Sequence, residues 1–170
     1  MVILICGASH TGKTIFAQKL LEAYNYPYLS IDHIKMGLIR SKQTFLTPED
    51  DDKLTDYLWP IIKEIIKTAI ENDQNLVIEG LYIPFDWKKD FGVKYLNKIK
   101  FLCLIMSKRY IEANYDKIIR HACDIEKRVN DFSFNQDYAI KENLKNLQMC
   151  NKYNCEYILI DKDYNFDIKI

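Results

Sequence analysis

The fold of this 170-residue chain is decided by one stretch, Gly7-Ala8-Ser9-His10-Thr11-Gly12-Lys13-Thr14. Its two glycines lie five positions apart, and a lysine and a threonine follow directly, which is the spacing of a phosphate-binding P-loop. In such a loop, backbone N–H groups surround phosphate oxygens, the lysine pairs with the outer phosphates, and the hydroxyl binds Mg²⁺. We therefore predict that all eight residues, from Gly7 to Thr14, bind the phosphates of a nucleotide.

The segments on either side of this loop fit the same interpretation. The apolar run from Val2 to Cys6 predicts a strand, and helical spacing predicts a helix from about Lys13 to Tyr24, with Tyr24 on its apolar face. A helix that starts at the loop supplies unpaired N–H groups and the positive end of its dipole to the phosphates. The context thus strengthens the motif.

Length and composition restrict the class of protein. A chain of 170 residues has the size of one domain, which we expect here. Lysine plus arginine and aspartate plus glutamate both number 24, so no net positive charge indicates nucleic acid as a general partner. We see no apolar run of the length needed to span a membrane and no signal peptide.

The cysteines indicate the compartment. There are five, at positions 6, 103, 123, 150 and 155, and an odd number in apolar surroundings is typical of reduced thiols rather than of a disulfide framework. Only Cys150 and Cys155 are close in sequence, and no second pair completes a zinc site. We therefore predict a cytoplasmic protein without structural zinc.

Beyond the first helix, predicted strands and helices alternate to the end of the chain. The predicted strands cover residues 28–31, 76–78, 99–106 and 157–160, and the helices cover residues 34–40, 47–70, the segment from about 109, and 135–153. This alternation predicts an α/β protein with a parallel sheet of about five strands, covered by helices and connected by right-handed crossovers.

Two of the predicted helices carry specific expectations. The second long helix should start at Thr47 as N-cap with Pro48 in its first turn, and should be kinked or split at Pro60. Its acids, residues 49–52, are explained by their place near the positive end of the helix without a metal ion. The last helix should turn Ile140, Leu144 and Leu147 toward the core.

Two acidic residues follow predicted strands, at the edge where open α/β sheets bind ligands. Asp32 follows the second strand and Glu79 follows the third, and either carboxylate could serve as the base or orient the acceptor. Alternatively, Asp32 caps the short helix after it, and Glu79 bonds to nearby backbone. Gly80 would let the chain pass close to a ligand or adopt a positive φ.

Basic residues are concentrated between residues 108 and 128. Guanidinium groups suit phosphate binding, so we expect Arg120 or Arg128 to contact the transferring phosphates, although a solvated charged helix face also explains the pattern. Arg40 either holds an anionic group of the substrate or ends the short helix in solvent.

Together, residues 7–14, the segment from Ser30 to Arg40, residues 76–80 and the basic segment resemble the P-loop kinases of small molecules and nucleotides. Residues 30–40 are similar to those of 2-phosphoglycerate kinase-like proteins and of zeta-toxin and chloramphenicol phosphotransferase relatives. The resemblance implies a three-layer P-loop NTPase fold with strand order 2-3-1-4-5 and a lid at about residues 120–134. It also implies adenine held near residues 161–164, and an Asp32 that binds or deprotonates the acceptor hydroxyl.

These observations predict an ATP-dependent kinase that acts on a hydroxyl or phosphate of a small metabolite or nucleotide, with ATP and Mg²⁺ as cofactors. The predicted catalytic residues are Lys13, Asp32, Glu79, Arg120 and Arg128. The metal would be held by Thr14 and Glu79, and the acceptor by Asp32, Arg40 and Gly80. The alternative is a nucleotide-dependent regulatory ATPase or switch that has no small-molecule acceptor.

Overall fold

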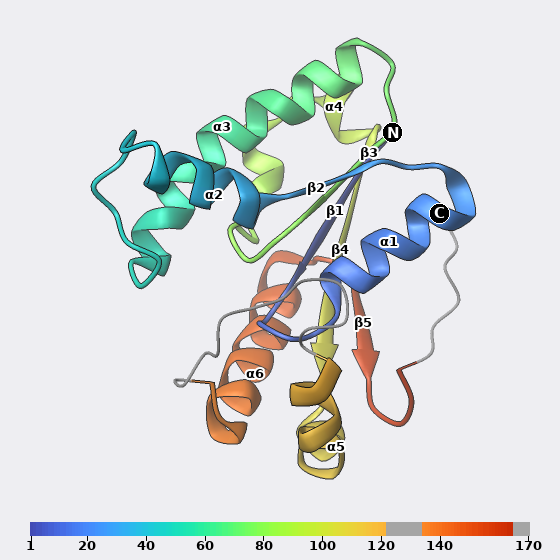
Figure 1. The fold of residues 1–170 in the computed structure, drawn as a ribbon. Coiled ribbons are helices and arrows are strands. Elements are labelled where there is room, and N and C mark those ends of the chain that lie inside the picture. The colour runs from blue at the N-terminus through green and yellow to red at the C-terminus, as the bar shows by residue number, and fades with distance from the viewer. Residues whose placement is uncertain (122–133, 165–170) are drawn as a thin grey trace.

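The computed structural model describes residues 1–121 and 134–164, which form an α/β fold around one sheet (Figure 1). The sheet has five parallel strands in the order β2-β3-β1-β4-β5. The strands are β1 (Val2–Gly7), β2 (Tyr28–Ser30), β3 (Leu76–Glu79), β4 (Ile99–Met106) and β5 (Tyr157–Ile160). The predicted fold class and strand order are confirmed.

Helices cover both faces of this sheet, and α1 and α3 lie on opposite sides of it in Figure 1. The helical segments are α1 (Lys13–Tyr24), α2 (Ile31–Arg40), α3 (Asp51–Glu71), η1 (Trp87–Asp90), α4 (Val93–Leu96), α5 (Lys108–His121) and α6 (Gln136–Tyr153). At least one helical segment lies between each strand and the next along the chain, and this provides the length of chain that a parallel crossover needs.

The burial of the central strand, β1, reflects the three layers of the fold, in which helices pack on both faces of the sheet. Every residue of β1 is buried, as a strand covered on both faces requires. Because side chains alternate along a strand, Leu4 packs in the cluster that contains α3, whereas Ile5 packs in the cluster that contains α1. In α1, Phe16, Ala17 and Leu20 are buried as predicted, but Tyr24 is exposed at the end of the helix.

Helix α6 is rotated about its own axis relative to the orientation that the spacing of its apolar residues predicts. Leu144 is 47% exposed, while the neighbouring Asn143 is only 2% exposed. Asn143 is buried because its side chain makes two hydrogen bonds: it accepts from the Met106 N–H at 2.8 Å and donates to the Ala139 carbonyl at 2.8 Å. The first bond satisfies an N–H at the end of β4, which burial would otherwise make costly.

Replacing Asn143 with alanine should therefore lower the free energy of unfolding by about 1–3 kcal/mol, because it leaves the Met106 N–H buried without its partner. Thermal or urea unfolding would measure the loss. Asn151→Ala is the matched control, since Asn151 is exposed on the same helix. Equal stability of the two variants would contradict this account of α6.

Helix α3 begins later than predicted and is not split. Its first residue is Asp51, because the Asp50 carboxylate accepts hydrogen bonds from both the N–H and the hydroxyl of Thr47 and closes a turn before the helix. These hydrogen bonds, with one from Lys53, lower the pKa of Asp50 to about 2. The helix then continues as one element through Pro60.

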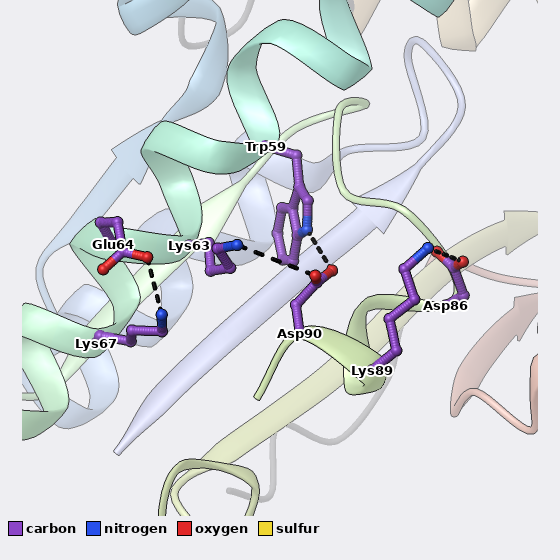
Figure 2. A network of polar contacts seen from close by, with 7 residues as sticks. All are labelled: Trp59, Lys63, Glu64, Lys67, Asp86, Lys89 and Asp90. Carbon is purple, nitrogen blue, oxygen red and sulfur yellow. Dashed lines mark hydrogen bonds and ion pairs between the residues drawn. The ribbon is translucent and has the colours of Figure 1, made fainter. Parts of the chain in front are cut away.

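A polar network joins α3 to the segment after β3 (Figure 2). The Trp59 indole donates a hydrogen bond of 2.8 Å to Asp90 at the end of η1, and Lys63 lies 4.0 Å from the same carboxylate. Asp86 pairs with Lys89 across the start of η1. The loop that leaves β3 is thereby held against α3.

Two further observations concern the described ranges, residues 1–121 and 134–164. None of their helices combines the length and apolar character needed to cross a bilayer. The thiols of Cys6, Cys103, Cys150 and Cys155 are buried and free, and Cys123 lies outside these ranges.

Candidate active site

The predicted P-loop connects the end of β1 to the start of α1. Gly12 has a φ of 82°, in the left-handed region, so that its N–H and the following helix N-terminus turn into the loop. The Thr11 hydroxyl donates to the Ala8 carbonyl at 2.8 Å and braces the loop from within. His10 also has a positive φ, and its ring packs on Phe134 with 4.2 Å between ring centroids.

Lys13 and Thr14 place their functional groups inside the protein. Lys13 is 6% exposed, and its Nζ donates to the Ala8 carbonyl at 2.8 Å, so the ammonium lies over its own loop. The Thr14 hydroxyl donates to Glu79 Oε1 at 3.4 Å, and Glu79 is 2% exposed. Two residues 65 positions apart in sequence thus form one buried pair of oxygens beside the loop.

The sheet register explains why these groups meet. Glu79 pairs with Ile5 of β1 on one side and with Ser30 of β2 on the other. The carboxyl ends of three neighbouring strands therefore lie at one edge, where the P-loop, Glu79 and the residues after Ser30 come together.

Asp32 lies in the first turn of α2, because β2 ends at Ser30 and the helix begins three residues earlier than predicted. Its carboxylate is 2.6 Å from Lys35 Nζ. Lys35 also donates to the Tyr82 hydroxyl at 3.0 Å, and Tyr82 donates to Asp51 at 2.8 Å. A continuous polar chain therefore runs from Asp32 to the start of α3.

Tyr82 keeps its proton within this chain. Burial and the hydrogen bond to Asp51 raise the pKa of its phenol far above the usual value. The phenol therefore acts as a donor to the carboxylate and an acceptor from the ammonium, and it fixes the distance between the two.

A cavity of about 440 Å³ adjoins the P-loop. Gly7 and Ser9 of the loop form part of its wall, together with the first turns of α3, the segment after β3 from Leu81 to Asp86, and one side of α6. Tyr82 and Asp51 line it, whereas Asp32 does not, so Asp32 reaches the cavity wall through Lys35. The volume lies in the range of sites for small molecules.

Gly80 is required by close packing rather than by its φ. A Cβ atom at this position would lie 2.8 Å from the Cβ of Ile31, and the described positive-φ glycines are Gly7 and Gly12. The close approach therefore joins the end of β3 to the start of α2, next to Asp32.

We expect Gly80→Ala to destabilise the protein by about 1–3 kcal/mol, because the added methyl group must displace Ile31 in a packed core. Thermal unfolding would measure this loss. Gly37→Ala is the control, because a Cβ atom there meets no atom within 4 Å. If Gly80→Ala were as stable as the wild type, the packing argument would fail.

The predicted basic residues lie away from the cavity or outside the described ranges. Arg40 is exposed at the far end of α2. Arg120 is exposed near the end of α5, where its Nε donates to the Asp116 carbonyl at 3.2 Å. Arg128 and most of the predicted lid, residues 122–133, lie outside the described residues.

The segment after β5 lies against the outer side of the P-loop. The Tyr164 hydroxyl is 3.0 Å from the Gly12 carbonyl oxygen and 3.1 Å from that of Thr11. Asp161 pairs with Arg109, and a hydrogen bond from Ser107 together with this guanidinium lowers the pKa of the Asp161 carboxyl. Residues 161–164 therefore border the loop and the start of α5.

A parallel sheet of this order, with a P-loop after its central strand, defines a P-loop protein of the α/β class. No protein-family model and no curated protein matches the sequence. The fold is similar to that of a candidate kinase from Chloroflexus aurantiacus, with a TM-score of 0.52 and 14% identity over 96% of this chain and 88% of that one.

Two further solved structures share the fold. A shikimate kinase from Acinetobacter baumannii, in complex with shikimate, has a TM-score of 0.51 and 15% identity over 96% of this chain and 84% of that one. An unliganded sugar kinase from Janibacter has a TM-score of 0.50 and 15% identity over 94% and 84%. At 14–15% identity, these likenesses show that the chain shares its fold with these kinases.

Sequence reasoning missed Lys35, Tyr82 and the cavity. Lys35 follows Asp32 by one helical turn, a spacing that brings the two side chains together and that was visible in the sequence. Tyr82 carries no such signal, because its partners come from α2 and α3, which lie far from it in the chain.

Proposed function

We propose that this protein is an ATP-dependent phosphotransferase that transfers the γ-phosphoryl group to a hydroxyl or phosphate of a small molecule or nucleotide. The single observation that supports this most is the cavity of about 440 Å³ that shares Gly7 and Ser9 with the P-loop. A switch needs the phosphate site alone, whereas a kinase needs space for a second reactant beside it.

In this proposal the phosphate half of the site is built from residues 7–14. The loop N–H groups and the start of α1 would hold the β- and γ-phosphates, and the Lys13 ammonium would move from the Ala8 carbonyl to the phosphate oxygens. Residues 161–164, which border the loop, would hold the adenine.

The acceptor half depends on the two carboxylates at the sheet edge. The acceptor oxygen attacks the γ-phosphorus, the bond from that phosphorus to the bridging oxygen breaks, and ADP leaves. An acceptor hydroxyl also gives up its proton. Asp32 is our proposed base, and the ion pair with Lys35 holds its carboxylate in one orientation. Arg120 and Arg128 stay predicted phosphate ligands.

Mg²⁺ fits the remaining pair of groups. The Thr14 hydroxyl and the Glu79 carboxylate are hard oxygen ligands within 3.4 Å of each other, beside the loop. Thr14 and Glu79 would hold the ion, which would neutralise part of the negative charge of the phosphates. A cation at this position would also offset the cost of burying the Glu79 carboxylate in the protein interior.

The test is acceptor-dependent ADP release by the purified protein with Mg-ATP and a panel of sugars, polyols, amino alcohols, hydroxy acids and nucleosides. We expect one class to raise ADP release well above the basal rate and to appear as a phosphorylated product by mass spectrometry. ADP release that no acceptor changes would favour the regulatory ATPase instead. Specific membership among 2-phosphoglycerate kinase-like, zeta-toxin or chloramphenicol phosphotransferase relatives stays a prediction.

A further inference from the structure

The cavity beside the P-loop has a strongly acidic wall. Five carboxylates line it and are opposed by a single lining ammonium, that of Lys145. The carboxylates come from three separate elements: Asp51, Asp52 and Asp56 from α3, Asp86 from the segment after β3, and Glu142 from α6. The acidic character therefore surrounds the cavity rather than belonging to one helix end.

Two of these carboxylates already have partners. Asp51 accepts the hydrogen bond from Tyr82, and Asp86 pairs with Lys89. Among residues 1–121 and 134–164, no lysine or arginine forms an ion pair with Asp52, Asp56 or Glu142. Three of the lining carboxylates thus form no ion pair within 4.0 Å among the described residues, and Lys145 is the one ammonium in the described lining.

Aromatic rings supply a second, independent feature of the same wall. Four aromatic residues, Tyr82, Phe85, Tyr138 and Tyr153, are among those that line the cavity. Two of them already accept ammonium groups of the protein: Lys35 Nζ lies 5.0 Å from the Tyr82 ring centroid, and Lys152 Nζ lies 5.0 Å from that of Tyr153. Aromatic faces beside carboxylates are the combination that binds ammonium ligands, because both place negative potential toward the cation.

From this wall we infer that the phosphoryl acceptor is a small molecule that carries both a hydroxyl and an ammonium group, such as an amino alcohol or amino sugar. This inference rests on the proposed function, because the cavity is taken as the acceptor half of that site. An anionic acceptor would enter against the charge of Asp52, Asp56 and Glu142. Arg40, the one predicted ligand for an anionic group, is exposed at the far end of α2 and does not line the cavity.

The phosphoryl-transfer step of the proposed function applies unchanged to the hydroxyl of such an acceptor. The hydroxyl oxygen forms the new bond to the γ-phosphorus, its proton passes to the carboxylate that serves as the base, and ADP takes the electrons of the broken bond. The ammonium takes no part in the reaction. It positions the molecule through the carboxylates of α3 and α6 while the hydroxyl points toward the P-loop.

Three polyols with the same six-carbon chain, which differ in the group at C1 and therefore in charge, test the inference. Glucamine carries an ammonium group, sorbitol is neutral and gluconate is anionic, while all three share a six-carbon chain with several hydroxyls. Calorimetric titration without ATP or Mg²⁺ should show glucamine binding at least about ten-fold more tightly than sorbitol, and gluconate more weakly than both. The advantage of glucamine should shrink as NaCl is raised, since exposed charges are screened.

The double variant Asp56→Asn/Glu142→Gln should remove most of this ten-fold preference while ATP binding is unchanged. The control Asp73→Asn/Glu112→Gln removes the same charge from exposed positions outside the cavity, where the two acids pair with Lys98 and Lys108. It should keep the preference. All four replacements preserve side-chain shape, and circular dichroism verifies folding.

Equal binding of glucamine and sorbitol by the wild type, or tightest binding of gluconate, would overturn the inference. So would an unchanged preference in the Asp56/Glu142 variant. Phosphorylation of sorbitol or gluconate without glucamine binding would refute the inference but keep the kinase. Glucamine binding without acceptor-dependent ADP release from any compound would keep the cavity preference and refute the kinase.

Discussion

If the proposed function is right, Lys13→Met should abolish tight nucleotide binding and lower ADP release by about 10³-fold, because it removes the lysine ammonium of the P-loop that would pair with the outer phosphates. Methionine matches the length of the lysine stem, so the buried position stays filled. Titration with ATP would measure the affinity, and coupled ADP release would measure turnover.

Lys67→Met is the control for this change. Lys67 lies on α3 and pairs with Glu64, so its loss removes a lysine without touching the loop. Its thermal stability and ATP affinity should match those of the wild type. If Lys13→Met bound ATP as tightly as this control, the phosphate half of the proposed site would be wrong.

The second large effect is expected at Asp32. Asp32→Asn should reduce acceptor-dependent transfer by about 10²–10⁴-fold and leave ATP affinity intact, because it removes a base without altering the P-loop. The amide keeps the size of the side chain but loses the charge that pairs with Lys35 at 2.6 Å. Single-turnover measurements with saturating ATP and acceptor would isolate this step.

Glu79→Gln separates the roles of the two carboxylates. If Glu79 holds Mg²⁺ with Thr14, its variant should recover activity as Mg²⁺ is raised, whereas Asp32→Asn should not. Asp73→Asn, at an exposed ion pair with Lys98, controls for the general effect of losing a charge. An Asp32→Asn enzyme with unchanged transfer would remove Asp32 from the mechanism.

The sheet was predictable because its signals are local. Buried strands appear as short apolar runs, and the predicted 99–106 strand matches β4 residue for residue. The rotation of α6 was not predictable in this way, because Asn143 occupies a core position through a hydrogen bond to β4. The start of α3 was missed because the Asp50 carboxylate accepts hydrogen bonds from Thr47 and closes a turn there, so that the helix begins only at Asp51.

In the candidate site, too, one part is contiguous in the sequence and could be predicted, whereas the other part is brought together only by the fold. Residues 7–14 are contiguous, so the sequence carries their spacing directly, and the register of β1, β2 and β3 brings Asp32 and Glu79 to the same edge. The proposed acceptor cavity is assembled from the start of α3, the segment after β3 and α6. Acids such as Asp52 look like ordinary residues of a first helical turn in the sequence, and only the fold shows that they line the same cavity as Glu142.

The origin of the cavity wall has a consequence for how such a protein can diversify. The internal bonds of the P-loop, from Thr11 and Lys13 to Ala8, involve neither α3 nor α6. Positions 52, 56 and 142 are not buried, so substitutions there can accumulate without weakening the phosphate cradle. If these side chains select the acceptor, as we infer, exchanging them would change it, and directed evolution toward a neutral or anionic acceptor should begin at those positions.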